Sequence, residues 1–262
     1  MFIQNCIDIL SKYWPSLLLG VKTTLKVSLT GTCAGLVLGL LVGGFRAVKL
    51  DYTASPISRF FKKLFDILAN IYITVFRGTP MMVQAVFIYY ALLNILNWTP
   101  LVAAIFVISV NTGAYMAEII RSGIQAVDVG QTEAARSLGM SNTQTMLSVV
   151  LPQAIRNAFP AIGNEFIVNI KDSSVLMIIS ITELMFQAKS IAGSTFHFTE
   201  TYFIEAVIYL CLTSVASFIL NFIERRMNQT PSISLPMSDT DPKSMKFVKL
   251  NEQKGMNTDN VN

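Results

Sequence analysis

Residues 27–45 read VSLTGTCAGLVLGLLVGGF, a continuous run without a charged side chain. A helix needs roughly 20 apolar residues to cross the hydrocarbon core of a bilayer, which is about 30 Å thick. This run therefore predicts a membrane-spanning helix, the first clear span of the chain.

The composition of the whole chain also indicates a membrane protein. Of its 262 residues, 52% are hydrophobic and 14% are charged, whereas a soluble protein has roughly 25% charged residues. So few charged groups cannot cover the apolar surface in water, and we expect membrane lipid to be part of the solvent. The composition argues against a soluble enzyme and against a nucleic-acid-binding protein.

Four further apolar runs predict four further spans, at residues 71–95, 101–117, 157–181 and 206–223, the first of them interrupted by RGTP at 77–80. We therefore predict an all-α membrane protein with five transmembrane helices. An odd number of spans places the two termini on opposite sides of the membrane.

The Lys and Arg residues outside these runs are unevenly distributed. Fourteen fall on the side of the C-terminus and four on the side of the N-terminus. Because the positively charged side of a membrane protein faces the cytoplasm, we predict an external N-terminus and a cytoplasmic C-terminus.

The chain then divides into three predicted parts. Residues 1–26 form an external segment, which carries apolar residues at helical spacing and is expected to lie on the membrane surface. Residues 27–226 form the transmembrane domain, with a cytoplasmic loop at residues 118–156. Residues 227–262 are polar, without periodic apolar spacing, and are expected to be a disordered cytoplasmic tail.

Four glycines recur every four residues in the first span and therefore share one helical face: Gly31, Gly35, Gly39 and Gly43. Such a stripe allows a second helix to approach closely. It predicts a packing seam, either within the bundle or against a second subunit. The alternative is that glycine is simply more frequent in membrane helices, but the regular spacing favours the seam.

The loop between the third and fourth spans predicts two short helices. The first contains Glu133 and ends at Gly139, which is placed for a left-handed cap. Ser141 and Gln144 have the spacing of a capping box that begins the second helix. Pro152 is expected to bend or break that helix.

This loop resembles the signature of the membrane subunits of ABC importers. The signature reads Glu-Ala-Ala, three residues, Gly, nine residues, Ile, one residue and Leu-Pro. The matching positions, with Val for Ile as the one departure, are Glu133, Ala134, Ala135, Gly139, Val149, Leu151 and Pro152.

A second resemblance narrows the family. FRGTP at 76–80, VQ at 83–84 and KDSSVL at 171–176 are similar to the polar amino acid permease group, which includes transporters of histidine, glutamine, glutamate, arginine and cystine. The resemblance extends from about residue 20 to residue 226.

The resemblance implies a type I ABC importer permease fold in the bacterial inner membrane. It also implies two cytoplasmic ABC ATPase subunits, a second permease subunit (identical or related), an extracytoplasmic solute-binding protein and a polar amino acid as substrate. ATP and magnesium would bind the ATPase, and the sequence itself contains no GxxxxGK[ST] motif. We expect no catalytic residue, no cofactor and no metal site in this chain.

The same resemblance assigns the loop a mechanical role. In the family it forms a coupling helix that docks in a cleft of the ATPase, where Glu133 would supply a polar anchor. Ala134 and Ala135 would keep the helix thin, and Gly139 would set its exit angle. Leu151 and Pro152 complete the coupling signature.

The fourth span carries charged residues that are costly inside a membrane and usually face an aqueous cavity. Glu165, Asn169 and Asp172 are spaced i, i+4 and i+7 and share one helical face, and Lys171 lies beside it. Both signs of charge suit an amino acid zwitterion, which makes this face a candidate substrate path. The alternative is that Lys171 pairs with an acid as a structural contact.

Arg77, in the second span, has three possible roles. It could line the path and meet the substrate carboxylate, reach lipid phosphates, or brace the coupling loop. Its predicted position near the cytoplasmic end of the span favours bracing. Glu118 and Arg121, at the end of the third span, are expected to form a structural i,i+3 pair.

Two other functions stay open from the sequence. An ion-driven secondary transporter would need its own ion site and usually contains an internal repeat, which is not visible here. A non-transporting membrane scaffold or sensor subunit would have no need of the charges in the fourth span.

Overall fold

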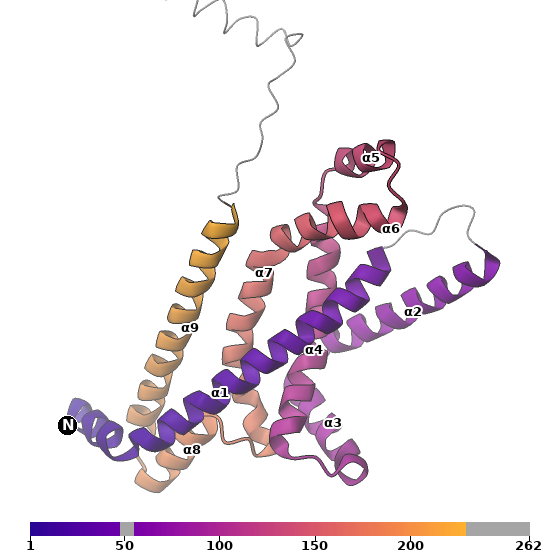
Figure 1. Cartoon of the computed structure of the whole chain (residues 1–262). Helices are drawn as coiled ribbons and strands as arrows, with labels where there is room; N and C mark the ends of the chain where they lie inside the picture. The colour runs from indigo at the N-terminus through magenta and orange to yellow at the C-terminus, as the bar shows by residue number, and fades with distance from the viewer. Residues whose placement is uncertain (48–54, 229–262) are drawn as a thin grey trace, which may run out of the picture. The chain divides into compact units, whose positions relative to one another are not determined.

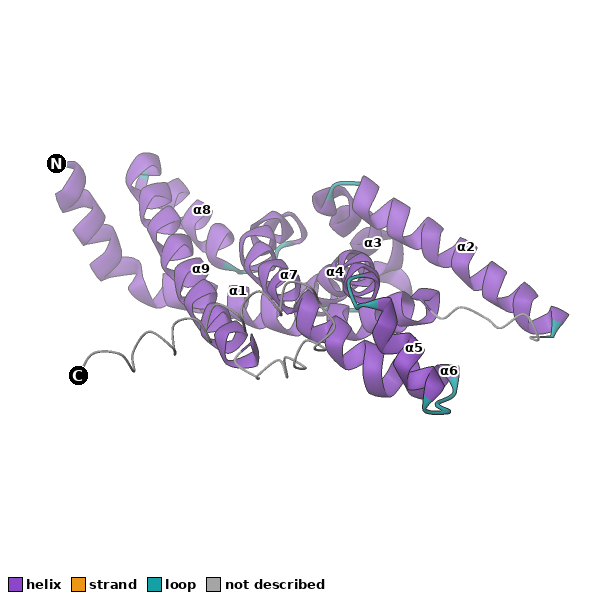
Figure 2. Cartoon of the chain, turned by 90° about the horizontal axis from the view of Figure 1, so that it is seen from above, coloured by secondary structure: helices purple, strands orange, loops and turns teal. Residues whose placement is uncertain are grey.

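The computed structural model describes residues 1–47 and 55–228, and its regular elements within these ranges are all helical (Figures 1 and 2). The segment predicted to be a disordered tail lies, from residue 229 onward, outside the described residues. In chain order the elements are α1 (Phe2–Ala47), α2 (Pro56–Gly78), α3 (Met81–Leu96), α4 (Pro100–Gln125), α5 (Val129–Ser137), α6 (Asn142–Thr145), the π-helix η1 (Met146–Val150), α7 (Leu151–Asp172), the 3₁₀ helix η2 (Ser173–Ile179), α8 (Leu184–Thr195) and α9 (Phe198–Asn228).

Three of these helices are long and apolar enough to cross a membrane, namely α1, α4 and α9. Two bent pairs pass the same test together. The pair α2 and α3 bends by 113°, and the pair of Asn142–Ile179 with α8 bends by 57°. The described part of the chain therefore holds three spans, or five if each bent pair is one span.

Helix α1 is longer than the predicted span. It runs without interruption through the segment predicted to lie on the membrane surface, so residue 26 is not a helix boundary. Figure 2 shows that α1 bends in its N-terminal part. Pro15 lies inside this helix, and a proline removes one helical hydrogen bond and crowds the preceding turn, which is a common cause of a kink.

Helix α4 also extends further than its charges suggest. The predicted span ends before Glu118, whereas the helix continues to Gln125. The side chain of Glu118 is paired with Arg46 and Arg121, so the charged residues at this end are accommodated within the helix and its neighbours.

The glycine stripe of α1 packs against α4 of the same chain. A Cβ atom added at Gly35 would lie 2.8 Å from Thr112 Cβ, and one at Gly43 would lie 2.6 Å from the Ala117 carbonyl oxygen. Gly31 and Gly39 meet Ile108 and Met116 in the same way. The four contacts follow one face of α4, so the structure places the seam within the bundle.

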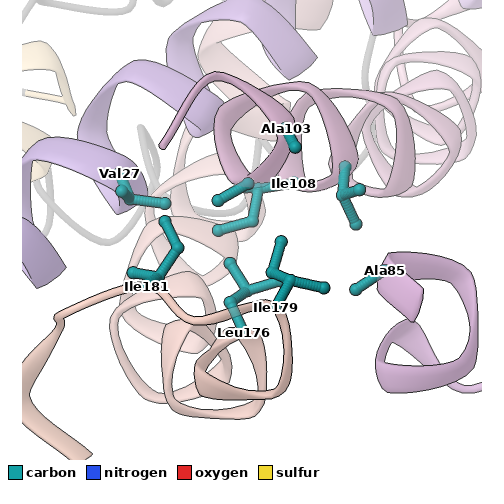
Figure 3. Packing of buried hydrophobic residues seen from close by; sticks show 9 residues of the cluster. Val27, Ala85, Ala103, Ile108, Leu176, Ile179 and Ile181 are labelled. Atoms are coloured by element: carbon teal, nitrogen blue, oxygen red, sulfur yellow. The ribbon is translucent and has the colours of Figure 1, made fainter. Parts of the chain in front are cut away.

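An apolar core joins four elements near one end of this seam. Figure 3 shows Val27 of α1, Ile108 of α4, Ala85 of α3 and Leu176 of η2 pointing toward one another. Each of these four side chains is fully buried. Their contact holds one half of each bent pair, α3 and η2, against the α1–α4 seam. A second buried cluster joins α1, α8 and α9.

Candidate functional site

Helix α5 and the short helix α6 form an exposed segment between α4 and α7, named here the coupling segment (Figure 1). The predicted left-handed cap is confirmed, since Gly139 has φ +82°. Gly139 N donates to the Arg136 carbonyl (2.9 Å) and Met140 N donates to the Ala135 carbonyl (3.2 Å). These two bonds satisfy the last carbonyls of α5 in a Schellman motif.

The predicted capping box is also present. Ser141 Oγ accepts from Gln144 N (3.3 Å), and Gln144 Oε1 accepts from Ser141 N (2.9 Å). The helix then widens into η1, where Leu151 N donates to the Met146 carbonyl. Pro152 lies directly after η1, and the chain stays helical from α6 through η1 into α7. The predicted disturbance at this proline therefore takes the form of a π-helical turn, without a break in the helix.

The coupling segment presents a mixed polar and apolar surface on a packed base. Glu133, Ala134 and Gly139 are exposed, whereas Ala135 is 4% exposed. Leu138 is 83% exposed. The base is the buried cluster of Val127, Val150 and Ala154. The exposed polar and apolar side chains of the coupling segment therefore stand on a packed base.

A second feature is a groove of about 750 Å³ among α2, α4 and α7. Arg77 borders it from α2, and its guanidinium lies over the Tyr115 ring of α4, 5.3 Å from the ring centroid. Glu165 borders it from α7. The groove therefore contains a cationic and an anionic side chain on different helices.

The remaining charges of the groove are paired with one another. The Glu118 carboxylate lies 2.6 Å from Arg46 and 2.8 Å from Arg121. The predicted pair of Glu118 and Arg121 is confirmed, and Arg46, which sequence spacing did not connect to it, links the pair to α1. Within the described residues, Arg77 and Glu165 have no ion pair, so they are the groove charges available to a ligand.

The structure places Arg77 at the border of this groove, and its expected role in bracing the coupling loop stays a prediction. The interruption of the second span at residues 77–80 is a bend of 113° between α2 and α3. Arg77 lies next to this bend, at the C-terminal end of α2.

The prediction for Asn169 needs a correction, because its side chain is buried among α1, α4 and α7. Its Nδ2 donates to Thr32 Oγ1 (2.8 Å) and Thr112 Oγ1 (3.0 Å), and the main-chain carbonyl of Asn169 accepts from Ser28 Oγ (2.9 Å). At 3% exposure, Asn169 joins three helices and does not line a path. Lys171 and Asp172 are exposed and lie outside the lining of the groove.

One structural residue, Glu183, gave no sequence signal. Glu183 is fully buried at the start of α8, where its carboxylate accepts from Met185 N (2.8 Å) and Phe186 N (2.7 Å). Capping residues of this kind are ordinarily short, so a glutamate at this position was not anticipated.

No group of three or more His, Cys, Asp and Glu residues suited to a metal occurs in the described ranges.

Known proteins resemble this chain over most of its length. The family profile described as "Binding-protein-dependent transport system inner membrane component" matches residues 35–229. The glutamine transport system permease protein GlnP of Escherichia coli (strain K12) is 40% identical over 223 residues, which cover 83% of this chain and 96% of that protein. The arginine transport system permease protein ArtQ of Bacillus subtilis (strain 168) is 34% identical over 215 residues, covering 81% and 93%.

Solved structures of ABC transporters contain chains with a similar fold. The crystal structure of an amino acid ABC transporter with histidines contains a chain that is 39% identical, with a TM-score of 0.73 and coverage of 83% of this chain and 96% of that one. A chain of the MetNI methionine ABC transporter in an inward-facing conformation is 22% identical, covers 80% and 95%, and shares the fold with a TM-score of 0.68.

The fold and the exposed coupling segment define a permease with the type I importer fold. The chain belongs to the binding-protein-dependent transport system inner membrane components, in the group of polar amino acid ABC transporter permeases. It is a multi-pass protein of the bacterial inner membrane, and the ATPase activity resides in a partner subunit. Family membership decides against the secondary transporter and the scaffold.

Proposed function

We propose that the chain carries a polar amino acid through the groove bordered by Arg77 and Glu165. An amino acid zwitterion offers a carboxylate to a guanidinium and an ammonium to a carboxylate. The groove presents these two groups from different helices, α2 and α7. This arrangement of opposite charges is the single observation that carries the proposal. The names of the relatives GlnP and ArtQ place glutamine and arginine first among the substrates to test, together with histidine.

The proposed transport is driven through the coupling segment. This segment joins α4 to α7, and these two helices also border the groove. A displacement of the segment by an ATPase would therefore act directly on two walls of the substrate path. Glu133, Ala134, Ala135 and Gly139 would contact the ATPase, and Leu151 and Pro152 would begin the helix that transmits the motion.

The proposed topology has five spans, with each bent pair crossing once. The distribution of Lys and Arg supports an external N-terminus and a cytoplasmic C-terminus, which places the coupling segment in the cytoplasm. Residues 1–26 would begin outside, 27–226 would form the permease domain, and 227–262 would be a cytoplasmic tail. The exposed apolar face of α9 would contact lipid.

The proposed assembly contains two permease subunits, identical or related, two cytoplasmic ATPases and an extracytoplasmic solute-binding protein. Uptake of radiolabelled glutamine, arginine and histidine into proteoliposomes that contain the assembled transporter tests it. We expect uptake of one of them to require ATP and the binding protein. Uptake that follows an ion gradient without ATP would contradict the proposal.

The coupling role has its own test. Glu133→Arg should abolish ATP-driven uptake, because it reverses the one acidic charge exposed on α5. Gly139→Ala should reduce uptake, because alanine at φ +82° costs about 1–2 kcal/mol. Membrane insertion should stay normal in both variants, and Gly139→Asn, which tolerates this backbone conformation, is the matched control. Normal uptake in both Glu133→Arg and Gly139→Ala would exclude this role.

A further inference from the structure

The break between α2 and α3 leaves backbone groups that need hydrogen-bond partners. Helix α2 ends at Gly78, Thr79 is extended, and Pro80 precedes α3. The last carbonyls of a helix have no donors within it, and a proline offers no N–H to them. Inside a membrane such groups are costly unless the protein itself satisfies them.

Two buried amides supply these partners, and we name the arrangement the clasp. Gln84 Nε2, from α3, donates to the carbonyls of Phe76 and Thr79, both at 2.9 Å. Asn111 Nδ2, from α4, donates to Gln84 Oε1 (2.8 Å) and to the Phe76 carbonyl (3.3 Å). Gln84 is 7% exposed and Asn111 is 9% exposed. The clasp therefore ties the end of α2 to α3 and to α4 at one buried point.

The clasp lies directly beside the residue that borders the groove. Arg77 follows Phe76, whose carbonyl accepts both amides. The Tyr115 ring beneath the Arg77 guanidinium lies one turn after Asn111 on α4, so both residues occupy the same face of that helix. One face of α4 thus makes two contacts with the end of α2. Asn111 binds the backbone of α2 at Phe76, and Tyr115 contacts the Arg77 guanidinium.

We propose that Gln84 and Asn111 are positioning residues, which hold the α2–α3 bend so that Arg77 stays at the groove. The substrate-binding consequence rests on the proposed function, in which Arg77 meets the substrate carboxylate. Neither amide reaches the groove itself, since neither is among the residues that line it. Their effect on transport passes through Arg77.

The first test is a double-mutant cycle on uptake by the assembled transporter in proteoliposomes, with radiolabelled glutamine, arginine and histidine as probes. Gln84→Met keeps the length of the side chain and removes its donors, and should raise KM about tenfold with a much smaller change in the maximal rate. Asn111→Leu should act in the same direction. In an Arg77→Ala background, Gln84→Met should raise KM no further, because the residue through which it acts is gone.

The matched control is Asn94→Leu, a polar-to-apolar change at an exposed position of the same helix α3. KM should remain as in the parent. If Gln84 had only a structural role, Gln84→Met would lower the maximal rate and the protein yield both in the parent and in the Arg77→Ala background. Effects of Gln84→Met and Arg77→Ala on KM that add in full would overturn the positioning role.

The second test does not depend on transport. Spin labels at Lys63→Cys on α2 and Ile95→Cys on α3, in a chain whose three native cysteines are replaced, report the bend as an interspin distance in the assembled transporter. Gln84→Met and Asn111→Leu should shift and broaden the distance distribution relative to Asn94→Leu. An unchanged distribution in both variants would overturn the clasp. A third outcome separates the two proposals. If Arg77→Ala leaves KM unchanged while Gln84→Met shifts the distance distribution, the proposed substrate contact is overturned and the clasp is supported.

Discussion

Arg77 and Glu165 illustrate how burial and pairing decide the role of a charged residue in this protein. Both border the groove, and neither has an ion pair within the described ranges. Glu118 borders the same groove, but its carboxylate is held by Arg46 and Arg121. A carboxylate with two arginine partners is costly to separate from them and acts as a structural contact. In the proposed path, Arg77 and Glu165 are therefore the two groups that would engage a zwitterionic substrate.

Glu165 and Asp172 share a helical face, but only Glu165 borders the groove, so substitutions at the two positions should have different effects. Glu165→Gln removes the anionic group of the groove and should raise the KM for uptake about tenfold, because a hydrogen bond to a charged group contributes roughly 1.5–3 kcal/mol. Asp172→Asn changes an exposed side chain outside the groove; it reaches Glu165 only through its charge and should change KM much less. Uptake competition with a series of amino acids measures both variants. Equal effects of the two substitutions would contradict the assignment of the path to the groove.

At the scale of elements, the α1–α4 seam sets how closely the central helices approach. The four glycines lie directly against side-chain and backbone atoms of α4, where a Cβ atom would leave too little room. Membrane helices gain no hydrophobic stabilisation from contacting one another, so close packing and buried hydrogen bonds hold them together. The bonds of Asn169 to Thr32 and Thr112 join the same two helices to α7.

Substitutions on α1 test this seam. Gly39→Ala places a Cβ against Met116 and the backbone of α4, and should lower the free energy of unfolding by about 1–3 kcal/mol. Gly44→Ala is the matched control, since nothing lies within 4 Å of the added Cβ. Thermal unfolding of the purified permease in detergent provides the comparison. Similar stability of the two variants would argue against the close α1–α4 contact.

At the scale of the whole molecule, function requires the coupling segment and the external loops to lie on opposite sides of the membrane. The proposed topology predicts which side each reaches. In a chain whose native cysteines are replaced, Phe196→Cys, 79% exposed between α8 and α9, should react in intact cells with a membrane-impermeant thiol reagent. Leu138→Cys, 83% exposed after α5, should react only after the membrane is opened. The reverse pattern would contradict the importer orientation.

Local features of the chain were predictable because they depend on neighbouring residues. The capping box at Ser141 and the left-handed cap at Gly139 follow from side-chain and backbone chemistry within one or two turns. The length of an apolar run determines whether a helix can span a membrane. The same local spacing carried the family resemblance. For that reason the sequence also predicted the two short helices of the coupling segment, whose contact with an ATPase stays a proposal.

The sequence by itself determined the helical membrane class, the caps of the coupling segment and the glycine face of α1, because each depends on contacts or periodicity along one helix. Only the tertiary structure decided that this face meets α4, that Asn169 is buried and that Arg77 borders the groove. Helical spacing shows which residues share a face but not which helix covers it. The position of Arg77 further depends on a 113° bend whose hydrogen bonds come from Gln84, at the start of the next helix, and from Asn111, which is distant in sequence and lies on α4.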